Sequence, residues 1–114
     1  MKIERTVNIL GTKYTISEVD DDKLEGLAGS TDFYTKEIKI SDMKTEKANC
    51  VITDNIDGFK KSVLRHEIVH AFLFESGLDM QSGECESWAN NETMVDWFAI
   101  QYPKIQKVFQ ELSV

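Results

Sequence analysis

The chain has 114 residues and a mass of 13.0 kDa, enough for one hydrophobic core, so we expect a single domain over residues 1–114. A formal net charge of −7 and a pI near 4.8 disfavour nucleic acid as a partner, because phosphate binding normally needs a basic face. No stretch approaches the roughly 20 apolar residues that cross a bilayer, and the N-terminus lacks the apolar core of a signal peptide. We therefore expect a cytoplasmic protein without a membrane partner, in which Cys50 and Cys85 are reduced structural thiols. The sequence leaves the oligomeric state open.

The first nineteen residues show the alternation of two half-buried strands. Apolar side chains recur at every second position, on odd numbers before Gly11 and on even numbers after it. These residues are Ile3, Val7, Ile9, Tyr14 and Ile16. The pattern predicts a β-hairpin, and the acidic run Asp20-Asp21-Asp22 after it is expected to be a solvated turn.

A second hairpin is expected over residues 33–40. Phe33-Tyr34 and Ile38-Lys39-Ile40 flank Thr35-Lys36-Glu37, while residues 26–30 before them have the composition of a loop. Residues 41–55 are harder to interpret. Within them, Cys50-Val51-Ile52 could be a short strand, or the whole segment a long loop that leads to the next element.

Three helices are predicted in the second half of the chain. Asp57 as N-cap and Gly77 as C-terminal stop place the first over residues 58–76. Helix-compatible sequence resumes over residues 86–101, and Pro103 is expected to end that helix and open a third. The apolar stripe of the third helix comprises Ile105, Val108, Phe109 and Leu112. Strands first and helices last predict an α+β fold, with a small N-terminal antiparallel β-sheet packed on the first helix and on two C-terminal helices.

The first predicted helix contains the only two histidines of the chain, in the HExxH motif His66-Glu67-Ile-Val-His70. Residues four apart on a helix share a face, so both imidazoles can reach one Zn²⁺ while Glu67 stands beside the open coordination position. The alternative is a pair of core histidines that bond to backbone. The segment is apolar nearly all round, which indicates burial, and a metal would satisfy the polar groups of such a helix.

A catalytic zinc site takes three protein ligands, so a third ligand must come from elsewhere in the chain. The second predicted helix offers Glu92 as that ligand. Asp96, four residues later, would accept a hydrogen bond from the free ring nitrogen of a zinc histidine. Both could instead be surface acids, but apolar neighbours on the same side favour packing. Weaker candidates for the third ligand are Asp79, Glu84, Glu86 and the thiolate of Cys85.

The order of HExxH on one helix and ExxxD on the next resembles the gluzincin metallopeptidases, and the shortness of the chain is similar to that of the minigluzincins. Residues 92–103, Glu-x-x-Val-Asp-x-Phe-Ala-x-x-x-Pro, also resemble the E-x-x-A-N-x-F-A segment of the ImmA/IrrE-type peptidases of phages and mobile elements. The departures are Val95 for alanine and Asp96 for asparagine, and neither removes a ligand. The resemblance covers residues 33–103, and its specificity lies in the two motifs.

This resemblance implies a zinc-dependent peptidase with His66, His70 and Glu92 as ligands. Zinc would lower the pKa of its bound water to about 7, and Glu67 would take the proton as that water attacks a peptide carbonyl. Glu67 would then return the proton to the leaving amine.

The resemblance also implies an edge strand that holds the peptide substrate in extended form, and residues 37–41 are the candidate. For stabilisation of the oxyanion beside the metal, Tyr34, Tyr102 and Arg65 are all open candidates.

Two other functions are compatible with the sequence. The first is a catalytically silent zinc-binding regulatory or interaction module of a phage or mobile element. It is disfavoured by Glu67, because a purely structural site has no use for a general base. The second is a latent enzyme whose tail, residues 104–114, occupies its own cleft. Core packing is the simpler interpretation of the apolar residues in that tail.

Overall fold

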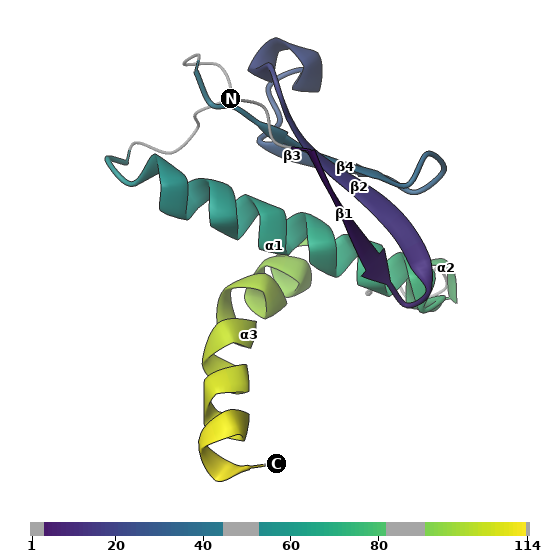
Figure 1. Ribbon diagram of the computed structural model, residues 1–114, viewed down its shortest axis with the longest axis vertical. Helices are drawn as coiled ribbons and strands as arrows, with labels where there is room; N and C mark the ends of the chain where they lie inside the picture. Colours follow the sequence, from purple (N-terminus) through teal and green to yellow (C-terminus); the bar gives the residue numbers. More distant parts are fainter. Residues whose placement is uncertain (1–3, 45–52, 82–90, 114) are drawn as a thin grey trace.

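The computed structural model describes residues 4–44, 53–81 and 91–113, and these form an α+β fold, as predicted (Figure 1). The elements are β1 (Glu4–Ile9), β2 (Thr12–Val19), the 3₁₀ helix η1 (Asp21–Leu24), β3 (Gly29–Asp32), β4 (Glu37–Ser41), α1 (Ile56–Glu75), α2 (Leu78–Gln81) and α3 (Glu92–Leu112). The sheet lies along one side of α1, and α3 crosses the other side. Neither long helix in the described part of the chain is apolar enough over its length to span a membrane.

The strands form one mixed sheet in the order β1-β2-β4-β3. The predicted first hairpin is confirmed, because β1 and β2 pair antiparallel, with Ile9 and Tyr14 fully buried. The predicted all-antiparallel sheet is wrong, because β2 and β4 are parallel. After β2 the chain passes through η1 to the far edge of the sheet, forms β3 there, and returns as β4 into the middle. Within η1, Asp21 is only 5% exposed, so the acidic run is not wholly a solvated turn.

This order corrects the prediction of the edge strand. Residues 37–41 form β4, which pairs with β2 on one side and with β3 on the other. A strand paired on both sides has no free backbone groups to offer a peptide. Among the described strands, β3 and β1 are the two edges, and β3 is the one beside α1.

A second hairpin is present, but its first arm is Gly29–Asp32. The predicted arm Phe33-Tyr34 lies in the turn, and residues 29–30, predicted as loop, belong to β3. The Asp32 carboxylate accepts hydrogen bonds from the backbone N–H groups of Tyr34, at 2.9 Å, and Thr35, at 3.0 Å, which fixes the turn after Asp32. At the other end of β3, a Cβ atom on Gly29 would lie 2.8 Å from Val63 Cγ1 of α1. Glycine therefore permits the close approach of β3 to α1.

Helix α1 starts at Ile56, two residues earlier than predicted. The N-cap is Asn55, not Asp57, because Asn55 Oδ1 accepts a hydrogen bond from the Gly58 N–H at 3.0 Å. The helix ends as predicted before Gly77, whose φ of 87° suits glycine. Between α1 and the sheet lies a core of Ile9, Tyr14, Ile38, Ile40, Met43, Val63 and Ala71.

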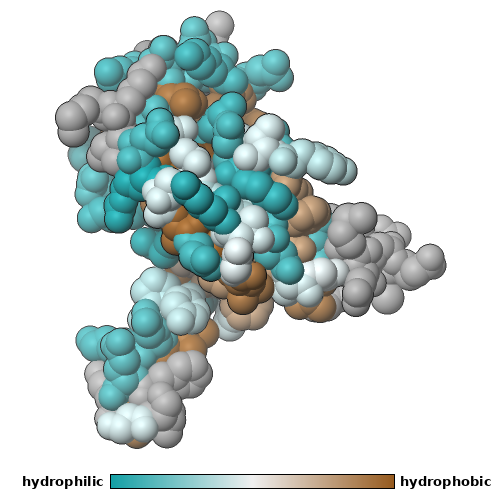
Figure 2. Space-filling view, turned by 45° about the vertical axis from the view of Figure 1, so that its right-hand side comes forward, coloured by the Kyte–Doolittle hydropathy of each residue, from teal (hydrophilic) through white to brown (hydrophobic). Residues whose placement is uncertain are grey.

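Helix α3 runs without interruption through Pro103, so the prediction of two separate C-terminal helices is wrong. Its first turns cross α1, where Val95 and Ala99 are buried. Its second half extends away from the body, and Figures 1 and 2 show this end standing apart from the rest of the molecule. Leu112 is 67% exposed, so it does not pack in the core, and residues 104–113 do not fold back over α1.

Candidate metal centre

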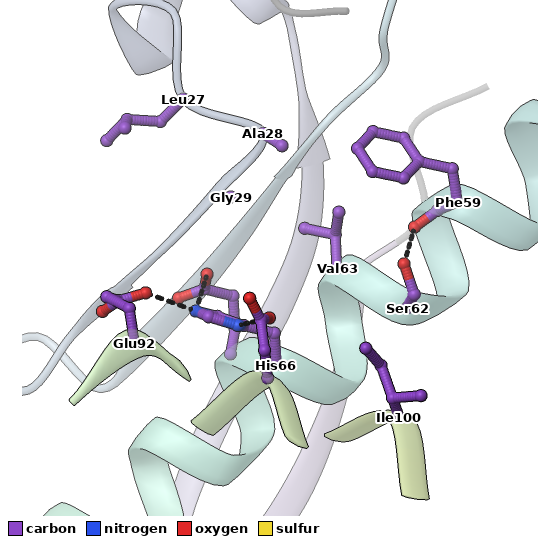
Figure 3. Close-up of a pocket in the computed structure, with 11 residues that line it drawn as sticks. Leu27, Ala28, Gly29, Phe59, Ser62, Val63, His66, Glu92 and Ile100 are labelled. Atoms are coloured by element: carbon purple, nitrogen blue, oxygen red, sulfur yellow. Dashed lines mark hydrogen bonds and ion pairs between the residues drawn. The ribbon is translucent and has the colours of Figure 1, made fainter. Parts of the chain in front are cut away.

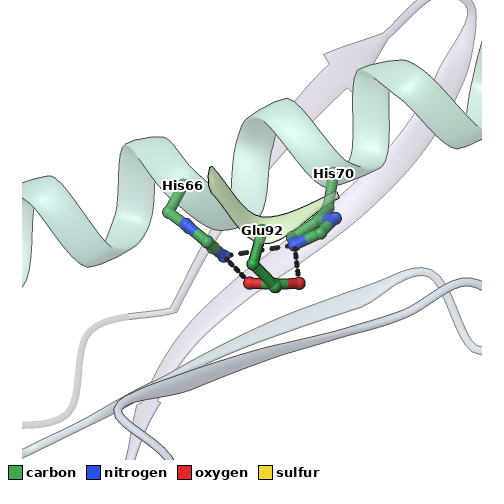
Figure 4. A group of neighbouring side chains, drawn as sticks. All are labelled: His66, His70 and Glu92. Carbon is green, nitrogen blue, oxygen red and sulfur yellow. Dashed lines mark hydrogen bonds and ion pairs between the residues drawn. The ribbon is translucent and has the colours of Figure 1, made fainter. Parts of the chain in front are cut away.

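Three side chains from α1 and α3 meet at one point (Figure 4). His66 and His70, one turn apart on α1, bring their Nε2 atoms to 3.1 Å from each other. Glu92, at the start of α3, places Oε2 3.0 Å from His66 Nε2 and Oε1 3.1 Å from His70 Nε2. The sequence spacing predicted this proximity, and within the described residues this is the group of ligand atoms that could hold a metal ion.

Glu92 reaches the histidines because the start of α3 is fixed on both sides. Asn91 Oδ1 accepts a hydrogen bond from the Met94 N–H at 3.0 Å, so the first turn of α3 is capped next to Glu92. Val95, which is fully buried, then anchors the same turn where α3 crosses α1. The carboxylate of Glu92 is thereby held over the histidines even though its side chain is 70% exposed.

Asp96 lies one turn further along α3, and its Oδ1 atom bonds to Nδ1 of His66. An ionised carboxylate accepts the Nδ1 proton, which leaves the His66 Nε2 lone pair directed toward Glu92. In the tautomer of His70 that also carries its proton on Nδ1, two imidazole lone pairs and a carboxylate converge with no proton among them. Such a set repels itself unless a cation or extra protons occupy its centre.

The donor set fits zinc. Two imidazole nitrogens and one carboxylate are the ligands of many catalytic zinc sites, and the carboxylate–histidine contact made by Asp96 is their usual support. Tetrahedral ligands at about 2.0 Å from a metal lie about 3.3 Å from one another. The separations of 3.0 and 3.1 Å between the facing atoms are close to that value.

Glu67 lies beside this cluster and is nearly buried, with 7% of its surface exposed. Burial raises the pKa of its carboxyl group, against the opposing effects of a hydrogen bond and of the two histidines. Thr31 Oγ1 on β3 donates the hydrogen bond to Glu67 Oε1 at 2.9 Å, and Glu67 Oε2 lies 4.0 Å from His66 Nε2. One carboxylate oxygen of Glu67 is thus held by the sheet, while the other faces the cluster of His66, His70 and Glu92.

Thr31 was not predicted as a site residue. Its segment shows no chemical motif, and its contact with Glu67 exists only because β3 packs closely on α1. No local pattern of sequence encodes that approach.

A cleft of about 420 Å³ opens beside the cluster (Figure 3). Its polar lining consists of His66, Glu67, Glu92 and Asp96. Its apolar lining includes Leu27, Phe59, Val63 and Ile100. Gly29 of β3 lies along the same cleft, so an edge strand, an apolar hollow and the histidine cluster share one space.

The remaining sequence candidates lie elsewhere. Asp79 is in α2 and is not part of the cluster, whereas Glu84, Glu86, Cys50 and Cys85 fall outside the described residues. None of the three oxyanion candidates lines the cleft: Tyr34 is 95% exposed in a turn, Tyr102 is 53% exposed on α3, and Arg65 contacts the backbone of α3.

No protein-family model, no curated protein and no solved structure matches the chain. The resemblance to gluzincins therefore stays a prediction from two motifs, and the function has to be inferred from the geometry of the cluster and the cleft.

Proposed function

We propose that the protein is a zinc-dependent peptidase that acts in the cytoplasm, with His66, His70 and Glu92 as zinc ligands and Glu67 as general base. The observation that carries this proposal is the convergence of two imidazole nitrogens and the two oxygens of one carboxylate, with facing atoms 3.0 to 3.1 Å apart, next to a buried carboxylate that has one oxygen free to face them. A purely structural zinc site would fill a fourth position with Cys or His and would gain nothing from Glu67.

Each residue has a distinct part in this reaction. When bound, zinc would supply a water of lowered pKa and would polarise the peptide carbonyl. Glu67 would accept a proton through its Oε2 atom, while Thr31 holds Oε1 in place. It would then deliver that proton to the nitrogen of the leaving amine. Asp96 would keep His66 in the tautomer whose Nε2 atom can bind a metal.

The substrate would be an extended peptide. The edge strand β3 adjoins the cleft, so a peptide could pair with its free side by strand addition, in the role first predicted for residues 37–41. The apolar lining of the cleft, which includes Leu27 and Phe59, would accept an apolar side chain of the substrate next to the scissile bond.

The test compares metal content and peptide turnover of the wild type and of Glu67→Gln. We expect both to bind one zinc ion per chain, and we expect the variant to lose about 10²- to 10⁴-fold in turnover, the usual contribution of a general base. Asp57→Asn is the matched control, because it makes the same acid-to-amide change on α1 at a side chain that is 81% exposed. Equal turnover by the wild type and Glu67→Gln would defeat the peptidase proposal.

One other outcome would select a different function. The side chains of Glu92 and Asp96 are 70% and 59% exposed, so a bound metal would be accessible from outside the protein. If the wild type bound zinc tightly and cleaved no member of a peptide library, this exposure would favour a zinc-binding regulatory or interaction module.

A further inference from the structure

Pro103 lies in the interior of α3, where it removes one backbone hydrogen bond. In a regular helix the N–H of residue 103 would donate to the carbonyl of Ala99, but proline has no N–H and its ring crowds that carbonyl. Ala99 is 2% exposed, so solvent has little access to this residue. A buried carbonyl without a donor is unfavourable, and a replacement donor is required.

Arg65 supplies that donor from the other helix. Its Nε atom donates to the Ala99 carbonyl oxygen at 3.1 Å. Hydrogen bonds from a charged donor are stronger than those between neutral groups, so this contact is a firm link between α1 and α3. Arg65 directly precedes His66 in the sequence, and the link therefore lies next to the proposed metal site.

The link also fixes which residues of α3 face α1. Glu92, Asp96 and Ala99 are spaced by four and then three residues, so they share one face of α3. A shift of α3 by one residue would rotate this face by about 100°, since a helix turns once in about 3.6 residues. Glu92 and Asp96 would then point away from the two histidines. The hydrogen bond between Arg65 and the Ala99 carbonyl would prevent this shift, because it can form in one register of α3 only.

We propose that Arg65 is a positioning residue. Its guanidinium replaces the N–H that Pro103 lacks, sets the register of α3 on α1, and thereby holds Glu92 and Asp96 against His66. The predicted effect on zinc binding rests on the proposed function. The replacement of the missing Pro103 N–H by Arg65 as hydrogen-bond donor to Ala99 does not depend on it. Arg65 thus acts through the backbone of α3 and not on the oxyanion.

A double-mutant cycle tests this role, with the wild type, Arg65→Met, Pro103→Ala and the double variant. Zinc affinity is measured by competition with a chelating dye, and the free energy of unfolding is measured on the metal-free proteins. We expect Arg65→Met to weaken zinc binding about tenfold, at the lower end of the effect of residues that orient metal ligands. In the double variant the N–H of residue 103 serves Ala99 again, so we expect the loss of unfolding free energy to shrink, whereas the link to α1 stays broken and the loss of zinc affinity stays near tenfold.

Non-additivity separates this role from simple stabilisation of α3. If Pro103→Ala only strengthened the helix, the loss of unfolding free energy caused by Arg65→Met would be the same in both backgrounds. Lys61→Met is the matched control, because it removes a positive charge from α1 at a side chain that is 69% exposed and pairs with Asp57 on the same helix. We expect it to leave zinc affinity unchanged.

The outcomes are distinct. An equal loss of unfolding free energy in both backgrounds, or no loss of zinc affinity in Arg65→Met, would overturn the proposal. If Arg65→Met alone failed to fold while the double variant folded and bound zinc, the rescue would support it. If the wild type bound no zinc, the proposed function would fail, and the cycle in unfolding free energies would decide the donor exchange alone: coupling between the two positions would support it and additivity would refute it.

Discussion

Two clusters, one around Glu75 of α1 and one around Glu92 of α3 with two histidines of α1, differ in the supply of protons. At the end of the helix, Glu75 accepts hydrogen bonds from Tyr14 Oη at 2.7 Å, from Thr12 Oγ1 at 2.8 Å and from Lys36 Nζ at 2.9 Å. Every contact brings a proton, so the cluster is complete. Around Glu92, the facing atoms are imidazole nitrogens, and each offers a proton or a lone pair according to its tautomer. Close polar groups are common to both clusters, and of the two only the second has ligand atoms that could hold a metal ion.

The pKa shifts of two acids on α1 reflect the same difference. The hydrogen bond from Tyr14, with those from Lys36 and Thr12, lowers the pKa of Glu75 to about 2. Burial raises the pKa of Glu67, which stands beside the histidines. The protein therefore stabilises the charge of Glu75, which fastens α1 to the sheet, and disfavours the charge of Glu67, which agrees with the proposed role of Glu67 as general base.

The largest effect is expected from His70→Ala, which removes a proposed ligand. We expect zinc affinity to fall by more than about 100-fold, beyond the range for residues that only orient ligands. The metal-free protein should keep its free energy of unfolding, because the change also removes a lone pair that faces Glu92. Dialysis against buffered zinc and denaturant titration measure the two quantities. Full zinc occupancy in this variant would contradict the ligand assignment.

For Glu75→Gln we expect the reverse of the His70→Ala result: a loss of stability without a loss of zinc affinity. The amide cannot replace three bonds to a charged acceptor, so we expect the free energy of unfolding to fall by about 1 to 3 kcal/mol, with zinc affinity unchanged. Glu18→Gln is the matched control, since Glu18 also links the sheet to α1, but through a single ion pair with Lys60 at 3.0 Å, in which the side chains are 22% and 27% exposed. Such a pair contributes about 0 to 1 kcal/mol. Equal losses in the two variants would show that the Glu75 cluster is no stronger than an ordinary surface pair.

The pH dependence of stability sharpens the same comparison. The ordinary pKa of Glu75 is 4.5 and its folded value is about 2, so its contribution is complete above pH 4.5 and is lost as pH falls toward 2. We expect the difference in unfolding free energy between the wild type and Glu75→Gln to shrink across this window. Urea titrations at several pH values measure it, and a difference that stays constant would contradict the assigned shift.

Local patterns were sufficient where structure depends on neighbours in the sequence. Alternation predicted the hairpin of β1 and β2, and the spacing of His66, His70 and Glu92 predicted that these side chains would meet. The position of β4 in the sheet was not predictable in this way. Ile38 and Ile40 alternate with polar residues whether their strand is central or at an edge, and only the path of the chain through β3 decides between the two.

Pro103 shows the same limit for helices. The local rule that proline ends a helix is physically sound, because one hydrogen bond is lost and one carbonyl is crowded. The rule fails here because Arg65, from a different helix, donates to the carbonyl that proline leaves unpaired. A compensation between distant parts of the chain cannot be deduced from the residues around Pro103.

The smallest effect that still separates the two clusters is expected from Thr31→Val, which removes one hydroxyl and keeps the shape of the side chain. Thr31 donates to Glu67 Oε1 at 2.9 Å, so its loss would free the proposed base to rotate. We expect kcat to fall about tenfold, the equivalent of one hydrogen bond of about 1.4 kcal/mol, with zinc content and KM unchanged. Thr31→Ser retains the hydroxyl and should retain most of the activity. If Ser and Val lowered kcat equally, Thr31 would support the packing of β3 and would have no part in holding Glu67.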